Sequence, residues 1–329
     1  MSSVNQTNSS AQNRFPVEHV LNIVEGFLVA TLNAITAIAI LANLKSQRQA
    51  TKGYLVVCGL CIADAFTGLA YMTAGCYRIH LIRNSLDQQS LSAWECMLKP
   101  HALLLCYSTP IAALMLVCTS SDRLLAVCFP FWYSRQDHKY ACKLLAVFYS
   151  FGFVFSCLVV GHASDQKISV ICLGSATLEP GSWMAQLRWL IRYGSGLLSV
   201  LLYCIIPVIY YRKTNSNCIN SRNMRKQRKL LTTLGISAIF TLILFVAPNL
   251  LKNYLVHYAS RAFWQWALPY LSNIALLNPL VNFWLFTWRH KDVRLSVKKL
   301  LRLERHPRLR ERRNALLPEI RETPLNDDT

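Results

Sequence analysis

The sequence predicts an all-α protein: a bundle of seven transmembrane helices followed by an amphipathic eighth helix on the cytoplasmic side. Three observations support this fold class. The 329 residues are 53% hydrophobic and only 16% charged, whereas about 25% of the residues of a soluble protein are charged. Apolar stretches of about 20 residues or more, long enough to cross a bilayer, recur along the chain. The basic residues gather in alternate loops between these stretches.

Seven apolar segments make up most of the chain. They cover residues 19–44, 54–80, 97–128, 140–163, 189–211, 230–256 and 265–287. Because lipid offers the backbone no hydrogen-bond partners, each segment should be an α-helix. One such segment could be a core helix of a soluble protein, but seven in succession exclude that interpretation. The chain then divides into a tail (1–18), a seven-helix domain (19–287), helix eight (288–303) and a basic tail (304–329).

The charge distribution predicts the orientation in the membrane. Loops 45–52, 123–143, 212–229 and 289–321 hold 26 of the 35 Lys and Arg residues. Since positive loops stay in the cytoplasm, the N-terminus should lie outside the plasma membrane and the C-terminus inside. Asn5 and Asn8 each begin a glycosylation triplet in the outer tail. The basic run after the last helix should attract anionic inner-leaflet lipid, and we expect no nucleic-acid partner.

Two of the twelve cysteines lie where a disulfide is expected. Cys96 is at the outer start of the third segment, and Cys172 is in the outer loop between the fourth and fifth segments, in an oxidising compartment. A bond between them would hold that loop to the third helix. Cys76, near the outer end of the second segment, is the competing partner. No cysteines and histidines have metal-ligand spacing, so no metal is predicted.

Polar residues within the membrane are costly and therefore candidates for function. Asp64 is the only acid deep in a segment, and Asn33 and Asn278 are its candidate partners. Together they could hold a sodium ion or water; the alternative is a protonated Asp64 hydrogen-bonded within the packing. Pro279 and Pro248 each remove a backbone hydrogen bond and should kink helices seven and six.

The dipeptide Asp122-Arg123 stands at the inner end of the third segment. Cys96 and Arg123 are 27 residues apart, which in a helix is about 40 Å, a membrane with its interfaces. An arginine held there by its neighbouring acid could be released when helices part, and could then meet backbone carbonyls of an inserted partner. The alternative is an arginine that reaches lipid headgroups beside a solvated Asp122.

These motifs, in this order and on these helices, resemble the rhodopsin-like G-protein-coupled receptors. The matching residues are Asn33, Leu60 to Asp64, Asp122-Arg123-Leu124, Pro130, Tyr203, Pro248 and Asn278-Pro279-Leu280-Val281-Asn282, with Trp288 to Leu303 as helix eight. The resemblance implies a heterotrimeric G protein as partner. It assigns coupling and activation to Asp122, Arg123, Tyr203, Asn278, Pro279 and Pro248. The sequence from Asp122 to Tyr133 is also similar to nematode serpentine chemoreceptors.

Departures from the family pattern indicate a divergent receptor. Leu124 and Asn282 replace two family tyrosines, and Val246 replaces a tryptophan of helix six. Many relatives hold the third-helix arginine with an acid at the foot of helix six, but residues 212–231 contain no acid. We therefore expect Arg123 to be restrained mainly by Asp122, and basal signalling to be relatively high.

The outer helix ends carry the candidate ligand pocket. No acid lies near Leu105, where amine receptors of the family carry one, and no lysine lies near Ser272 to bind retinal. The polar and aromatic candidates are His101, Tyr107, Arg188, Arg192, Lys252, His257, Trp264, Gln265 and Tyr270. They suit an anionic small molecule or a peptide carboxylate. In the alternative interpretation, the three cations reach the outer headgroups.

Two other protein classes explain less of the sequence. A secondary transporter should show internal repeats and charged, broken helices near the midplane, and neither is present. An enzyme would need a nucleophile with a base, or a metal cluster, at a common depth, and none is visible. A seven-helix protein that does not signal remains an alternative. Apart from a sodium ion near Asp64, we expect no cofactor.

Overall fold

The computed structural model describes residues 15–46, 52–163, 165–172, 178, 181–216, 235–258, 261–289 and 291–301. The expected glycosylation sites Asn5 and Asn8 and most of the basic tail lie outside these ranges.

Seven long helical segments form the body of the protein. Five are single helices: α2 (Phe15–Ser46), α3 (Lys52–Arg83), α5 (Pro100–Cys128), α7 (His138–Gly161) and α12 (Arg261–Arg289). The fifth segment along the chain consists of α8 (Trp183–Trp189), η1 (Leu190–Gly194) and α9 (Ser195–Ser216). The sixth consists of helical residues 235–241, η2 (Leu242–Val246) and α11 (Ala247–Tyr258). Six of these segments are long and apolar enough to cross a membrane. The seventh, α12, is 29 residues long and carries buried asparagines, among them Asn273 and Asn278. The predicted all-α, seven-helix bundle is confirmed.

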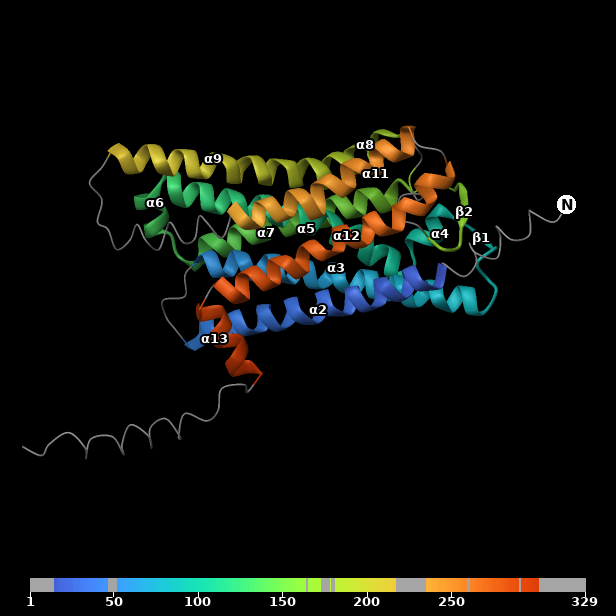
Figure 1. Ribbon diagram of the computed structural model, residues 1–329, viewed down its shortest axis with the longest axis horizontal. Helices are drawn as coiled ribbons and strands as arrows, with labels where there is room; N and C mark the ends of the chain where they lie inside the picture. The colour runs from blue at the N-terminus through green and yellow to red at the C-terminus, as the bar shows by residue number, and fades with distance from the viewer. Residues whose placement is uncertain are drawn as a thin grey trace, which may run out of the picture.

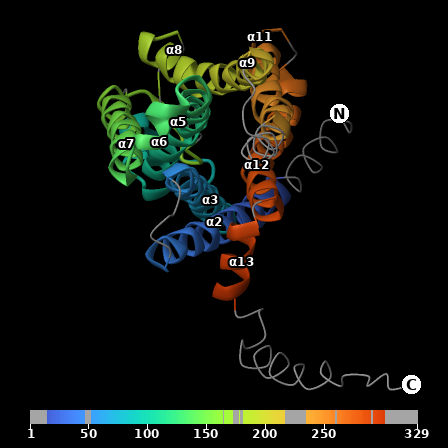
Figure 2. The ribbon, with the colours of Figure 1, turned by 90° about the vertical axis from the view of Figure 1, so that its left-hand side faces the viewer.

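The helices lie side by side along the long axis of the molecule and form a ring when seen from one end (Figures 1 and 2). Helix α5 is central and packs against α3, α7 and α9, while α12 packs against α2 and closes the ring. Pro110 lies inside α5 and Pro207 inside α9. The two π-helical turns, η1 and η2, interrupt helices five and six.

Large apolar side chains cover the outside of the bundle. On α7, for example, Val147, Phe151, Phe153 and Val154 are each more than half exposed. Water would make such a continuous apolar surface unstable, whereas hydrocarbon would not. The interior also holds polar side chains, including Asn33, which is 1% exposed. An apolar outer surface around an interior that includes polar side chains is typical of a membrane bundle.

Helices α2 and α3 approach each other closely at glycines. A Cβ added to Gly68 would lie 2.6 Å from the Gly26 carbonyl oxygen, and one added to Gly26 would lie 2.6 Å from the Met72 nitrogen. Small residues allow such contact between helix backbones in lipid, where packing rather than water release drives association. This crossing fixes α3, and with it Asp64, against α2.

One end of the bundle, called here the disulfide end, carries short elements. Strands β1 (Ser90–Ser92) and β2 (Lys167–Ser169) pair antiparallel there, beside helix α4 (Ala93–Met97). Cys96 and Cys172 form a disulfide, and Cys76 is free and exposed. The pairing predicted from the sequence is therefore confirmed.

Cys96 itself does not belong to the third long helix, contrary to the sequence prediction. It lies in α4, which a capping box of Ser92 and Glu95 begins. Helix α5 starts afresh at Pro100, in the first helical position, where a proline is best tolerated. Cys96 and Arg123 are therefore not joined by one continuous helix.

The opposite end, called here the Arg123 end, carries α6 (Pro130–Arg135) and α13 (Lys291–Leu300) (Figure 1). Helix eight was expected from Trp288 to Leu303, but Trp288 belongs to α12 and the separate helix begins at Lys291. Val293 and Val297 of α13 are buried in the hydrophobic core, beside residues of α2 and α3. The short helix is thus packed at the foot of the bundle.

Candidate functional site

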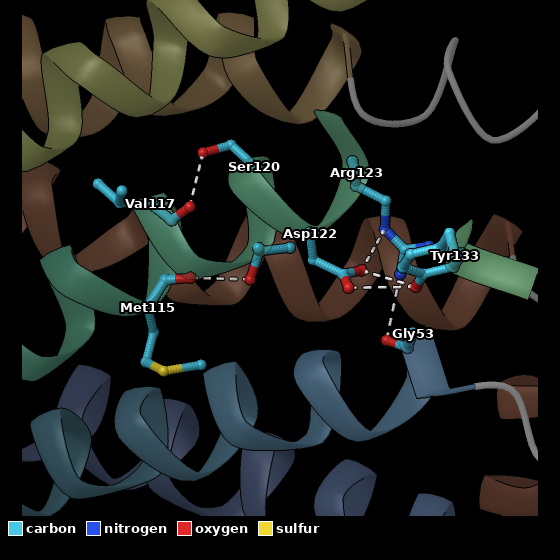
Figure 3. A network of polar contacts seen from close by, with 8 residues as sticks. Gly53, Met115, Val117, Ser120, Asp122, Arg123 and Tyr133 are labelled. Carbon is cyan, nitrogen blue, oxygen red and sulfur yellow. Dashed lines mark hydrogen bonds and ion pairs between the residues drawn. The ribbon is translucent and has the colours of Figure 1, made fainter. Parts of the chain in front are cut away.

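Arg123 and Asp122 lie in the last two turns of the third long helix, α5, in a network of polar contacts (Figure 3). The Asp122 side chain is fully buried, and its Oδ2 lies 3.7 Å from Nε of Arg123. The guanidinium also donates from Nη2 to the Gly53 carbonyl oxygen of α3, at 3.1 Å. Arg123 is therefore held against the start of helix two.

Tyr133 of α6 completes the contacts of Asp122. Its hydroxyl donates to both carboxylate oxygens, each at 3.1 Å. Burial raises the pKa of Tyr133, and the neighbouring Asp122 charge raises it further, so this hydroxyl keeps its proton at physiological pH. A buried carboxylate needs such donors to stay charged. Tyr133 and Arg123 together stabilise Asp122 in the apolar bundle.

Lys52 joins the start of α3 to α6 by hydrogen bonds. Its ammonium donates to the carbonyl oxygens of Tyr133 and Gln136, the latter at 2.6 Å, and lies 4.5 Å from the centre of the Tyr133 ring. A cation suits this position because the last carbonyls of a helix carry no internal partners. Sequence reasoning did not identify Lys52 or Tyr133 as site residues. The only signal was the aromatic run from Phe129 to Tyr133.

Gly53 allows the arginine to approach this closely. A Cβ at position 53 would lie 2.5 Å from Nη2 and 2.7 Å from Nη1 of Arg123. Any other residue would therefore push the guanidinium away from the carbonyl oxygen that it binds.

Among the described residues, no hydrogen bond or ion pair is seen between Arg123 and helix six. Tyr203 is buried on α9 near the arginine, and it packs with Ala238 of helix six and Leu124 of α5. Helices six and seven are joined separately, because the Ser237 hydroxyl donates to the Asn282 side-chain oxygen at 3.0 Å. Asn282 occupies the place of a family tyrosine.

A cavity of about 40 Å³ lies inside the bundle. Its walls come from helices two, three, five, six and seven: Asp64, Thr67, Tyr71, Thr109, Ala112, Leu116, Arg192, Phe245, Ala275, Leu276, Asn278 and Pro279. Asp64 Oδ2 and Asn278 Oδ1 are buried and have no hydrogen-bond partner among the described residues. Pro248 is buried on α11, directly after the π-helical turn η2.

Asn33 is buried on α2 and is not a wall residue of this cavity. Its amide donates to the Val29 carbonyl oxygen of its own helix, at 3.0 Å. Of the three residues expected to form one polar network, the structure therefore brings Asp64 and Asn278 together in one cavity.

Of the nine candidate ligand residues, Arg192 lines the cavity. Arg188 and Lys252 are half-buried, and Tyr270 is 44% exposed. The side chains of His257, Trp264 and Gln265 lie outside the described part of the structure. His101 is buried and stacks on Tyr77, with ring centres 4.2 Å apart.

Tyr107 faces away from the cavity. Its ring makes edge contacts with Phe66 and Phe153, each at 6.4 Å between ring centres. Thr109, two residues later, lines the cavity, and two helical residues are about 200° apart around the axis. Tyr107 is therefore not among the wall residues of this cavity, because position along the helix alone does not give the direction of a side chain.

Sequence reasoning missed Thr67, Tyr71 and Phe245 as wall residues. The first two lie three and seven residues after Asp64, a spacing that places them on one face of a helix. That spacing was a usable signal. Phe245 had no comparable signal, because it lies in the π-helical turn η2, which shifts the register of helix six.

Comparison with known proteins identifies the family of the chain. The zebrafish (Danio rerio) trace amine-associated receptor 13c is 26% identical over 300 residues, covering 84% of each chain. The mouse (Mus musculus) olfactory receptor 8C8 is 25% identical over 228 residues, covering 65% of this chain and 69% of the mouse protein. The profile of the seven-transmembrane receptors of the rhodopsin family matches residues 33–286. The chain therefore belongs to the rhodopsin family of seven-transmembrane receptors, which are multi-pass membrane proteins and not enzymes.

Proposed function

We propose that this receptor is chemosensory and converts the binding of an extracellular small molecule or short peptide into activation of a heterotrimeric G protein. The observation that carries the proposal is the set of contacts of Arg123. They join helices two and three and α6, and among the described residues none joins helix six. The described part of helix six, residues 235–258, could therefore move without breaking an ion pair of Arg123.

Release of Arg123 would create the binding site for the partner. The guanidinium has five donors, of which the Gly53 contact uses one, so it can donate to backbone carbonyls of an inserted helix. Tyr133 can keep donating hydrogen bonds to the Asp122 carboxylate when the arginine leaves. The contacts of Arg123 with Asp122 and with the Gly53 carbonyl hold the resting state. Because these contacts are few, we expect part of the receptor population to adopt the active state without ligand, in line with the expected high basal activity.

The ligand is expected to be acidic. Arg192 lines the cavity. Arg188 and Lys252 lie close enough to Arg192 for its positive charge to repel theirs. Charge-assisted hydrogen bonds from arginine favour carboxylates. The relatives named for odours and trace amines support a chemosensory role. The charge that we expect of the ligand is inferred from the residues of this chain and not from those names.

We also propose a sodium ion at Asp64. The donors fit such an ion, since Asp64 Oδ2 and Asn278 Oδ1 are buried, lack partners among the described residues and line one cavity. Oxygen ligands suit hard cations. Sodium, compared with potassium, should raise the unfolding temperature of the receptor but not that of Asp64→Asn. An equal effect of sodium on both proteins would contradict the site.

The Arg123 end should face the cytoplasm of the plasma membrane. The exposed Lys298 and Lys299 of α13 would then meet anionic inner-leaflet lipid, while Val293 and Val297 hold the helix to the bundle. Protease accessibility of tags at the two termini in intact cells tests the orientation. An N-terminal tag that the protease reaches only in permeabilised cells would contradict this orientation.

In nanodiscs, replacing phosphatidylserine with neutral lipid should lower the unfolding temperature of the receptor more than that of the double variant Lys298→Gln, Lys299→Gln.

Nucleotide exchange tests the coupling. The purified receptor in nanodiscs should accelerate GDP release from at least one member of a panel of Gα subunits. Arg123→Ala should abolish the acceleration, since the released guanidinium forms the partner contact. Arg83→Ala, an exposed arginine at the disulfide end, is the matched control and should exchange like the parent.

A further inference from the structure

The cavity wall includes a half-buried cation, Arg192, that the described residues do not neutralise. Arg192 Nε has no hydrogen-bond partner there, although the Arg192 side chain is hydrogen-bonded to Tyr71. The ion pair seen in the described part of the chain joins Arg123 to Asp122, at the far end of the bundle. A buried guanidinium nitrogen without a partner is costly, and the described residues supply no counter-charge, so the cavity favours an anion.

The basic and the acidic side chain in the wall lie at different depths, Arg192 in the outer part of the cavity and Asp64 in the inner part. Lys252 of α11 lies near enough to Arg192 for the two charges to repel, and Arg188 adds a third positive charge one helical turn before Arg192. Asp64 is the only acid in the wall. It lies seven residues before Tyr71 on α3, about 10 Å deeper along the helix. An amine would have to pass the cations to reach Asp64, whereas an acid meets them first.

The size and walls of the cavity limit the ligand. A cavity of about 40 Å³ is small and favours a compact ligand, such as a carboxylate with a short chain. Phe245, Leu116 and Leu276 provide apolar surface in the same cavity. A short chain would lie against these side chains while its carboxylate accepts hydrogen bonds from the guanidinium.

We propose that this cavity is the binding site of a short-chain monocarboxylic acid, whose carboxylate accepts hydrogen bonds from Arg192 and Tyr71. This inference rests on the proposed receptor function and names the ligand class of that receptor. It differs from what the name of the trace amine-associated relative suggests, because Arg192 and Lys252 disfavour an amine at this position.

The position of the site connects it to the moving parts of the bundle. Arg192 lies in the π-helical turn η1 and Phe245 in the π-helical turn η2, and both face one cavity with Asn278 and Pro279 of α12. Such turns are frequent at functional sites. A bound acid therefore contacts helices five and six where their regular hydrogen bonding is already interrupted.

Thermal unfolding of the purified receptor tests the site with propionate as the probe. Millimolar sodium propionate, compared with sodium chloride, should raise the unfolding temperature by a few degrees. Propylamine and the neutral propionamide should not. Arg192→Gln should weaken the apparent affinity for propionate at least tenfold, and Tyr71→Phe should weaken it severalfold. Arg212→Gln, an exposed arginine on α9, is the matched control and should bind propionate like the parent.

Several results would overturn the acid site. They are equal stabilisation of the parent and Arg192→Gln by propionate, no stabilisation of the parent, and stronger stabilisation by propylamine. Where Arg192→Gln does not fold, unchanged propionate affinity in Tyr71→Phe would overturn it. The nucleotide-exchange assay separates the two proposals. Normal exchange without propionate binding removes the acid site and leaves the receptor function, whereas absent exchange removes the receptor function.

Discussion

Single residues at the Arg123 end decide how tightly the arginine is held. The guanidinium shares its interactions between the Asp122 carboxylate and the Gly53 carbonyl, and Tyr133 fixes the carboxylate. The sequence alone indicated the arginine and its acid. It could not indicate Gly53, because that contact joins residues 70 positions apart on two helices.

Gly53→Ala should raise basal nucleotide exchange roughly tenfold. The new Cβ would lie 2.5 Å from Arg123 Nη2, so the guanidinium must leave the Gly53 carbonyl. A hydrogen bond to a charged group contributes about 1.5–3 kcal/mol, and about 1.4 kcal/mol shifts an equilibrium tenfold. Gly161→Ala, whose Cβ would meet no atom within 4 Å, is the matched control. Equal exchange rates for the two variants would show that the Gly53 contact does not hold the resting state.

At the scale of helices, hydrophobic length and charge predicted where each segment lies, and the ends that fall within the described residues agree to within about six residues. The rotation of a helix about its axis was harder to predict. Tyr107 and Thr109 lie on opposite sides of α5, and Phe245 faces the cavity from a π-helical turn. Such directions depend on packing between helices, and packing is not visible in the periodicity of one sequence.

The crossing of α2 and α3 should not tolerate a side chain. Gly68→Ala would place a Cβ 2.6 Å from the Gly26 carbonyl oxygen, and backbone atoms of two packed helices cannot move aside cheaply. Overpacking of this kind costs about 1–3 kcal/mol. The unfolding temperature in nanodiscs should therefore fall by several degrees, while Gly161→Ala leaves it nearly unchanged. Equal unfolding temperatures would mean that the two helices do not approach so closely.

For the whole molecule, the interior cavity and the Arg123 end are assigned different tasks. A cavity in the interior carries Arg192 and Asp64, and the Arg123 end carries a network that leaves helix six unattached among the described residues. Helices six and seven connect the two, through Phe245, Asn278 and Pro279 in the cavity wall. The formal charge of +19 fits this arrangement, because most of the cations lie in the loops and tail on the side proposed to face the cytoplasm.

The basal rate of GDP release from Gα tests the central proposal most directly, measured for the parent receptor and Arg123→Ala in the same nanodiscs without added ligand. We predict clear acceleration by the parent and none by Arg123→Ala, with the Arg83→Ala control equal to the parent. No acceleration by the parent with any Gα subunit, or equal acceleration by Arg123→Ala, would contradict the proposed coupling. Solute flux through vesicles that contain the receptor, without acceleration of exchange, would indicate a transporter instead.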